Sequence, residues 1–154
     1  MTAAQAELPA DLHARIRDLC AAGDALTESG CLAEALSQYT AALALLPPPY
    51  TQWSAATWIL AAIGDAQFQS GDFAAGKDSL SLAMHCPDAI GNPFLHLRLG
   101  QCRFELGEHR RASDDLARAY ILEGLRIFQD EDPKYLAFIK PQLRPPNGGW
   151  PTGW

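Results

Sequence analysis

The sequence predicts an all-α protein made of three similar helical hairpins that stack side by side and end in a short capping helix. The first observation behind this prediction is a pair of glycines, seven residues apart, that occurs three times: Gly23 and Gly30, Gly64 and Gly71, Gly100 and Gly107. The second is a small–large–small order after each pair: Ala35, Tyr39 and Ala42; Gly76, Leu80 and Ala83; Ala112, Leu116 and Ala119. Self-similarity at a nearly fixed period indicates stacked repeats.

The two glycines of each pair are expected to have different roles. Gly30, Gly71 and Gly107 lie between segments whose apolar residues recur at helical spacing. Glycine tolerates the positive φ that a tight turn between two helices needs, so these residues should end the first helix of each hairpin. The earlier glycine and the small residues have no bulk beyond Cβ. The paired helices can therefore approach closely while the large residue of each copy fills the remaining space.

The elements can be placed in order along the chain. Repeats are expected at residues 16–49, 52–90 and 93–126, with helices at 11–29, 32–46, 52–70, 73–85, 93–106 and 108–128, and a capping helix at 132–140. Pro47 and the two prolines after it cannot continue a helix, so they end the second one. Pro93 suits a first helical turn, and Asp132 suits an N-cap. The first glycine interval is longer than the second, which places extra length in a loop at 48–54.

One domain and a tail are expected. A chain of 154 residues can bury a core without support from disulfides or a metal. We place this domain at residues 1–140 and an irregular tail, rich in proline and glycine, at 141–154. The tail contains Trp150 and Trp154. Because an indole ring is costly to leave in water, these side chains should fold back onto the chain or insert into a partner.

The glycines, the small positions and the closing residues Pro47 and Pro87 resemble the tetratricopeptide repeat over residues 16–124. The sequence departs from the family pattern three residues after the first glycine, where Leu26, Gln67 and Arg103 replace the usual aromatic residue. The resemblance implies a right-handed superhelical solenoid whose concave side is lined by the first helix of each hairpin. It also implies that the chain binds a protein partner and is not an enzyme.

The charge distribution favours a basic partner over nucleic acid. The chain carries 12 Lys and Arg against 18 Asp and Glu, a net charge of −6. Residues 18–76 contain no Lys or Arg at all. Such an acidic surface repels nucleic acid and speeds encounter with a basic protein, although it can also serve solubility alone. No apolar run reaches the roughly 18 residues of a membrane-spanning helix, so the chain is not expected to be an integral membrane protein.

Residue patterns for catalysis or metal binding are scarce. The phosphate-binding loop, the dinucleotide fingerprint and the Cys-x-x-Cys pair are missing, and we expect no metal and no cofactor. His85 and Cys86 point about 100° apart on a helix and are interpreted as packed or surface residues. The acidic run 130–132 is interpreted as helix capping and not as a cation site. No secretory signal is visible, so the four cysteines are expected to be reduced thiols in a cytoplasmic protein.

One face of the first helices is the candidate protein-binding surface. Acidic and aromatic residues alternate along it, and basic and amide side chains accompany them. The candidate residues are Arg17, Asp24, Trp58, Asp65, Phe94, Arg98 and Gln101. Asp24, Asp65 and Gln101 each follow the repeat glycine, so stacking should set them in a row. Aromatic anchors with a few oriented polar groups are typical of binding surfaces. Phe68 and Phe104, on the same face, are expected to belong to the core; Trp58 suits either role.

Two narrower resemblances can be weighed. Tetratricopeptide domains that hold acidic chaperone tails use Lys and Asn as a carboxylate clamp, but the matching positions here are Cys20, Asp24, Ala62, Phe94 and Arg98. Only Arg98 suits that role, which argues against this subclass. The stretch 91–101 and residues 132–135 resemble small bacterial tetratricopeptide proteins found beside polymorphic or Rhs-type toxins. That resemblance implies an immunity protein that neutralises a cognate toxin. The alternative is a scaffold or adaptor that self-assembles through its C-terminal end.

Overall fold

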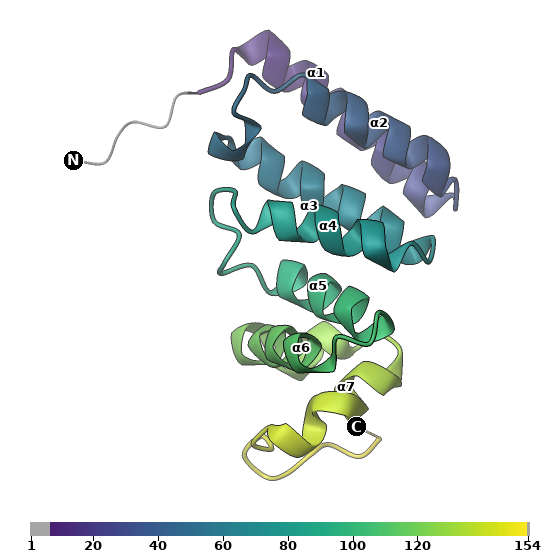
Figure 1. Ribbon diagram of the computed structural model, residues 1–154, viewed down its shortest axis with the longest axis vertical. Helices are drawn as coiled ribbons and strands as arrows, with labels where there is room; N and C mark the ends of the chain where they lie inside the picture. The colour runs from purple at the N-terminus through teal and green to yellow at the C-terminus, as the bar shows by residue number, and fades with distance from the viewer. Residues whose placement is uncertain (1–6, 154) are drawn as a thin grey trace, which may run out of the picture.

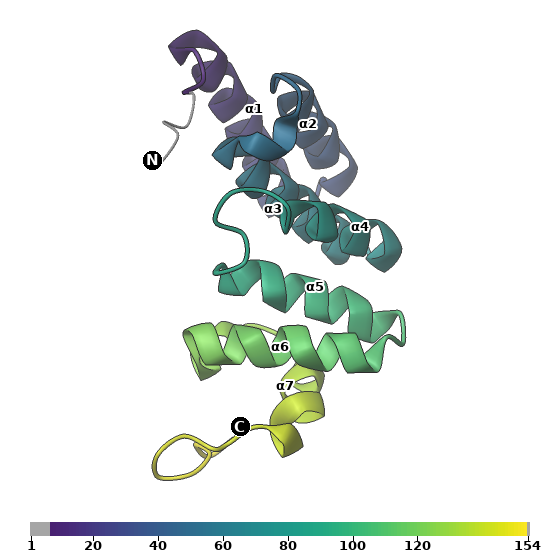
Figure 2. The same cartoon turned by 60° about the vertical axis from the view of Figure 1, so that its left-hand side comes forward.

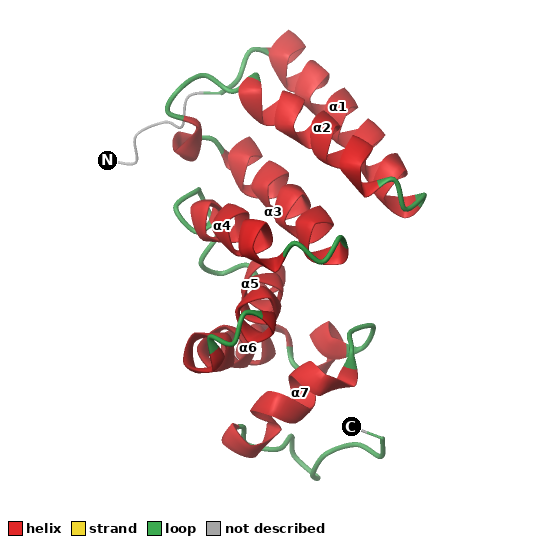
Figure 3. Cartoon of the chain, turned by 45° about the vertical axis from the view of Figure 1, so that its right-hand side comes forward, coloured by secondary structure: helices red, strands yellow, loops and turns green. Residues whose placement is uncertain are grey.

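The computed structural model describes residues 7–153 and shows helical hairpins stacked along one axis (Figure 1). The helices are α1 (Ala10–Glu28), α2 (Leu32–Ala44), α3 (Ser54–Gln69), α4 (Phe73–Ala83), α5 (Pro93–Glu105), α6 (His109–Glu123) and α7 (Pro133–Ile139). Short 3-10 turns lie at Tyr50–Gln52, Leu125–Phe128 and Lys140–Gln142. Residues 7–153 contain no strand (Figure 3), so the expected all-α solenoid is confirmed.

The repeated glycines have the roles expected for them. Gly30, Gly71 and Gly107 have φ of 79°, 81° and 80°. A Cβ on the earlier glycine of each pair would stand 2.5 Å from Tyr39 Cε1 at Gly23 and 2.4 Å from Leu80 Cγ at Gly64. At Gly100 it would stand 2.8 Å from Leu116 Cγ. These separations are too short for real Cβ contacts, so each hairpin depends on a glycine that faces the large residue of its second helix.

Two apolar clusters form the core. The larger one runs through α1 to α5 and contains Ile16, Tyr39, Ile59, Leu80 and Leu95. The smaller one joins α5 and α6 to the C-terminal segment and contains Leu97, Leu116, Phe128, Tyr135 and Ile139. Phe68 packs against both clusters and Phe104 against the second, which confirms their predicted core role.

The predicted sixth helix is wrong at its C-terminal end. It ends at Glu123, not at residue 128, because Gly124 has φ 80° and ψ −164° and breaks the helical path. The chain then makes the 3-10 turn Leu125–Phe128 and enters α7 at Pro133, with Asp132 as N-cap. Figure 2 shows α7 beneath the α5–α6 hairpin, at the end of the stack. Gly124 thus lets the C-terminal segment turn back onto α5.

The extra length between repeats one and two lies where it was expected. Tyr50–Gln52 form a 3-10 turn, and α3 begins at Ser54 instead of residue 52. The Trp53 Nε1–H group donates a hydrogen bond to the Pro47 carbonyl oxygen at 2.7 Å. This bond fixes the Trp53 indole beside the N-terminal end of α3.

The tail packs on the last helices. The Trp150 ring centroid lies 6.1 Å from that of Tyr120, and the Lys140 Nζ atom lies 5.0 Å from the Trp150 ring. The Tyr120 hydroxyl donates to the Arg144 carbonyl oxygen at 3.3 Å. Trp150 therefore folds back onto the chain, as one of the two expectations had it, whereas Trp154 lies outside the described residues.

Candidate functional site

The seven residues predicted for the binding face fall into two groups. Arg17, Asp24 and Trp58 are exposed on an open groove over α1 and α3. Asp65, Arg98 and Gln101 are instead joined by hydrogen bonds to one another and to Glu131. Phe94 stands at the boundary, because it lines the groove and also packs against the Arg98 guanidinium. The expected continuous row along all three repeats is therefore interrupted at the third.

The open part, called here the N-terminal groove, consists of three adjoining hollows of about 440, 340 and 320 Å³. The first and second share His13 and Trp58, and the second and third share Asp24. The second hollow adds Arg17, Cys20 and Ala21, and the third adds Thr27, Glu28, Tyr39, Ala61, Ala62, Asp65 and Phe94.

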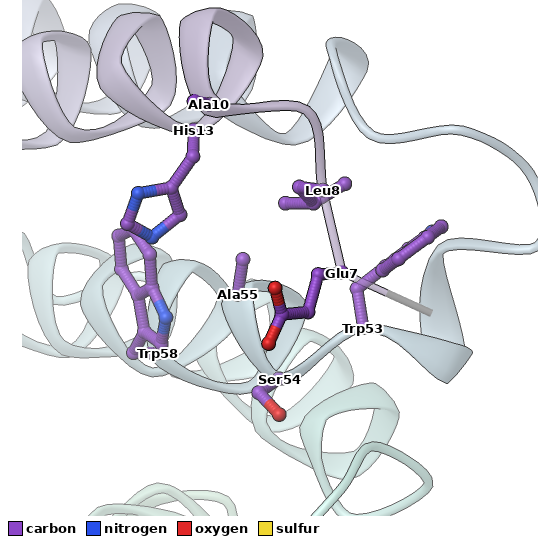
Figure 4. Close-up of a pocket in the computed structure, with 8 residues that line it drawn as sticks. All are labelled: Glu7, Leu8, Ala10, His13, Trp53, Ser54, Ala55 and Trp58. Atoms are coloured by element: carbon purple, nitrogen blue, oxygen red, sulfur yellow. The ribbon is translucent and has the colours of Figure 1, made fainter. Parts of the chain in front are cut away.

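The first hollow lies between the N-terminal ends of α1 and α3 (Figure 4). The rings of Trp58 and His13 stand on one side of it, and Leu8 and Trp53 stand on the other. Trp58 is 39% exposed. The Glu7 carboxylate points into the hollow. This end of the groove thus offers apolar ring surface with one acidic group beside it.

Cys20, which lines the middle of the groove, is not a reactive thiol. Cys20 is buried, and desolvation together with the nearby Asp24 carboxylate raises the pKa of its thiol to about 11. The thiol is therefore protonated at neutral pH, whereas the thiolate is the reactive form. Ala21 beside it is small, so a bound chain can approach α1 closely.

Asp24 dominates the third hollow. Its Oδ1 atom accepts a hydrogen bond from the Tyr39 hydroxyl at 2.6 Å, and the same hydroxyl lies 3.2 Å from Thr27 Oγ1. Burial and then the bond to Asp24 raise the pKa of Tyr39 to about 12. The phenol thus remains a donor and holds the exposed Asp24 carboxylate in one orientation. Within residues 7–153, no Lys or Arg forms an ion pair with Asp24 or Glu28.

The closed part is the arginine network, formed by Asp65, Arg98, Gln101 and Glu131. The Arg98 Nε–H group donates to Asp65 Oδ1 at 2.6 Å, and Nη1 donates to Gln101 Oε1 and to Glu131 Oε2, each at 2.7 Å. Gln101 Nε2 donates to the same Glu131 oxygen at 2.8 Å. The Glu131 carboxylate, from the C-terminal segment, thereby accepts hydrogen bonds from both side chains of α5. Gln101 is thus buried and the Arg98 side chain mostly buried, whereas helical spacing had placed both on the exposed face.

Two aromatic rings complete the surroundings of Arg98. The guanidinium carbon lies 4.7 Å from the Phe68 ring centroid and 5.2 Å from that of Phe94. The Arg98 side chain is only 12% exposed. Burial lowers the pKa of Arg98, but the carboxylates of Asp65 and Glu131 outweigh it and raise that pKa. The cation is compensated within the chain, as a charge this deep in a protein has to be.

Sequence reasoning missed Glu131. The acidic run 130–132 was interpreted as a helix cap, and that role belongs to Asp132, whose Oδ1 accepts from the Lys134 backbone N–H at 2.9 Å. Glu131 instead reaches Arg98, 33 positions earlier in the chain. The available signal was that an N-cap needs one carboxylate and the run supplies three. No local pattern pointed to Arg98 as the partner.

The remaining candidates do not form a common site. His96 is buried, with Nδ1 3.5 Å from Asp115 Oδ1 and Nε2 2.7 Å from the Ile90 carbonyl oxygen. The Cys86 thiol is buried and donates to the Leu82 carbonyl oxygen, while His85 is exposed, so the two do not face one target. In the described part of the chain, no three His, Cys, Asp or Glu side chains are grouped to hold a metal ion. No helix there is long and apolar enough to cross a membrane.

Solved structures with the same architecture are tetratricopeptide domains. One is the first such domain of Spaghetti (RPAP3) bound to the HSP90 peptide SRMEEVD, with TM-score 0.63, 20% identity, and coverage of 82% of this chain and 91% of that one. A second is the Arabidopsis OM64 domain, with TM-score 0.67, 17% identity and coverage of 86% and 99%. The Yersinia enterocolitica type III secretion chaperone SycD, in complex with a peptide of the translocator YopD, has TM-score 0.66, 16% identity and coverage of 88% and 95%.

These similarities establish the fold. The sequence matches no family model and no curated protein. The hairpins predicted from the glycines thus have the same fold as the hairpins of these solved structures. Function has to be argued from the groove itself.

Proposed function

We propose that this chain is a non-enzymatic protein-binding module that holds a basic protein partner in the N-terminal groove. The observation that carries the proposal is the division of one face into two parts. Asp24, Glu28 and Trp58 stay exposed over α1 and α3, while Arg98 and Gln101 are satisfied inside the chain. A concave surface with aromatic anchors and uncompensated acidic groups favours a partner of opposite charge.

The solved structures support binding of a peptide or protein, and the charge of the groove indicates the sign of the charge on that partner. The RPAP3 domain is bound to SRMEEVD, a peptide with three acidic residues. In this chain Asp24 stands in the groove and would repel such a ligand. The SycD chaperone is in complex with a translocator peptide, so two of the solved structures with this fold hold a peptide.

The most specific form of the proposal is a bacterial immunity protein that neutralises a cognate toxin. It rests on the resemblance of residues 91–101 and 132–135 to tetratricopeptide proteins found beside polymorphic toxins. An acidic groove suits a toxin domain that acts on nucleic acid, because such a domain carries a basic surface. Occupying that surface would block substrate access. Complementary charge also speeds association, which a neutralising protein needs.

Selection of peptides tests the general proposal. A displayed library of random 12-residue peptides is selected against the wild type and against the Asp24→Lys/Glu28→Lys variant. The matched control is Asp18→Lys/Glu34→Lys, which makes the same charge change at two exposed acids outside the groove lining. We expect Lys and Arg to be enriched by the wild type and the control only. Equal enrichment by all three proteins would contradict the proposal.

Co-expression tests the specific form. The chain is produced together with a candidate toxin domain that acts on nucleic acid, and growth is scored. We expect wild type and the control pair to restore growth, and Asp24→Lys/Glu28→Lys to restore it less. If Asp24→Lys/Glu28→Lys restores growth as well as wild type does, the acidic groove has no part in neutralising the toxin.

A scaffold that self-assembles is the second candidate, and one observation favours it. Ile121 is 76% exposed and Leu122 is 47% exposed on α6, next to Tyr120, on which Trp150 packs. Light scattering on wild type and Ile121→Asp measures the mass in solution. A dimer or larger assembly that Ile121→Asp converts to monomer would favour the scaffold. A monomer in both cases would exclude assembly through this surface.

A further inference from the structure

We infer that the segment held in the N-terminal groove is extended and carries one large apolar side chain and one Lys or Arg, three to five residues apart. This inference rests on the proposed function and specifies the partner's chemistry. It follows from the different character of the two ends of the groove and from the distance between them.

The apolar side chain belongs in the first hollow. Trp58 presents ring surface there at 39% exposure, and Leu8 and the Trp53 ring form the opposite side. The bond from Trp53 Nε1 to the Pro47 carbonyl oxygen holds that ring in place, so little ordering is needed when a ligand enters. A hollow of about 440 Å³ accommodates an aromatic ring. Glu7 points its carboxylate inward, which suits the positive edge of such a ring.

The cation belongs in the third hollow. Asp65 also lines it, but both its oxygens are engaged, Oδ1 by Arg98 and Oδ2 by Gln69 Nε2 at 2.8 Å. Asp24 and Glu28 are the acids left to attract a ligand cation. Asp24 is held in position by the Tyr39 hydroxyl at 2.6 Å, so the carboxylate is oriented before binding.

The surroundings fix the order along the groove. Arg17 lines the middle hollow and would repel a cation placed there. Beyond Phe94, the Arg98 guanidinium and the Glu131 carboxylate already satisfy each other. The Lys or Arg of the ligand should therefore lie at Asp24 and Glu28, and the segment should leave the groove near Phe94.

The spacing follows from helix geometry. Seven residues separate Trp58 from Asp65 on α3 and eleven separate His13 from Asp24 on α1. At a rise of about 1.5 Å per residue, these intervals span roughly 10 and 16 Å. An extended chain advances about 3.3 Å per residue. Three to five residues thus connect the two ends.

Synthetic peptides test the inference directly. Ten-residue peptides in a Gly/Ser background carry a fluorescent label, one Phe and one Arg at a separation of one, four or eight residues, in both orders. Binding is measured by fluorescence anisotropy. We expect the separation of four to bind about tenfold more tightly than one or eight in at least one order, because only then are both anchors seated. Replacing Arg by neutral citrulline, or Phe by Ser, should cost a similar factor.

Protein variants assign each anchor to its end. In Trp58→Ser, the affinity difference between the Phe peptide and its Ser analogue should disappear. In Asp24→Asn/Glu28→Gln, the difference between the Arg and citrulline peptides should disappear, and in the control Asp18→Asn/Glu34→Gln both differences should persist. Circular dichroism spectra and melting temperatures matching wild type confirm that each variant is folded.

The outcomes separate this inference from the proposed function. Affinity that does not depend on separation, or no binding of any peptide below about 1 mM, overturns the two-anchor inference. If the peptide with Ser in place of Phe binds as tightly as the Phe peptide, the two-anchor inference is also overturned, but the proposal of an acidic groove for a basic partner is not. If the library selection shows no dependence on Asp24 and Glu28, the proposed function fails as well.

Discussion

Over α1 and α3 the face made by the first helices is open, whereas over α5 it is covered by the chain's own C-terminal segment. The hairpins beneath are alike, since each is closed by a glycine against a Tyr or Leu of the second helix. The difference lies in side-chain pairing. Arg98 meets Asp65 and Glu131, while Asp24 and Glu28 meet no Lys or Arg within residues 7–153.

This difference shows that a solenoid can have the same backbone in every repeat and still offer only part of a face for binding. The closed part stabilises the stack, because the arginine network joins α3, α5 and the segment before α7. The open part keeps charge and ring surface in solvent, which stabilises the fold little, and we propose that this surface binds a ligand. The predictions below address each part in turn.

The largest expected effect comes from removing the buried cation. Arg98→Met leaves the carboxylates of Asp65 and Glu131 close together without a counter-charge, so it should lower the free energy of unfolding by about 3 to 5 kcal/mol. The matched change in the open part, Arg17→Met, should alter it by less than about 0.5 kcal/mol. Urea unfolding followed by circular dichroism measures both. Equal losses of unfolding free energy in the two variants would mean that the closed part does not stabilise the fold more than the open part does.

Hairpin packing should respond equally in the two parts. Gly23→Ala and Gly100→Ala each place a methyl group under 3 Å from the facing Tyr39 or Leu116 side chain, which should cost about 1 to 3 kcal/mol in each case. Gly91→Ala is the control, because its Cβ would meet open space and its φ is not positive. Thermal unfolding measures all three. A large effect in one half alone would indicate that the hairpins are not equivalent.

Acid should weaken the attachment of α7. Burial alone would raise the pKa of Glu105, but hydrogen bonds from Lys134 and Tyr135 lower it below its ordinary value. A lowered folded-state pKa contributes stability that is complete above the unfolded value of about 4.3 and is lost as pH falls through the folded value. Because the Lys134 side chain is 44% exposed, we expect this pair to contribute less than about 1 kcal/mol to the free energy of unfolding.

Urea midpoints measured between neutral pH and pH 3 test the attachment of α7. In both Glu105→Gln and Lys134→Met, the loss of stability on acidification should be smaller than in wild type. If Glu105→Gln loses as much stability as wild type between neutral pH and pH 3, the Glu105–Lys134 pair does not hold α7.

Much of the fold could be predicted because its causes are local. Gly30, Gly71 and Gly107 turn the chain through their own φ, and Pro93 and Asp132 mark helix starts within one turn. The end of α6 at Glu123 was missed, since Gly124 follows an apolar-periodic segment that continues to Phe128. Periodicity alone does not show whether a helix continues or the chain turns back.

The candidate site was predicted in part. Helical spacing found Arg17, Asp24 and Trp58 on the exposed face, because exposure of a helix residue depends mainly on its direction around the axis. The same spacing placed Gln101 on that face, and it is fully buried. What covers it comes from a segment 30 positions later in the chain.

The amino-acid sequence by itself determined three glycine-closed hairpins, their order and an acidic first half, since these depend on backbone conformation and composition over short stretches. Only the tertiary structure decided which part of the shared face remains open. Glu131 can reach Arg98 only after Gly124 has turned the chain and the stack has brought the two elements together. An ion pair between distant positions is a property of packing, and helical periodicity carries no information about it.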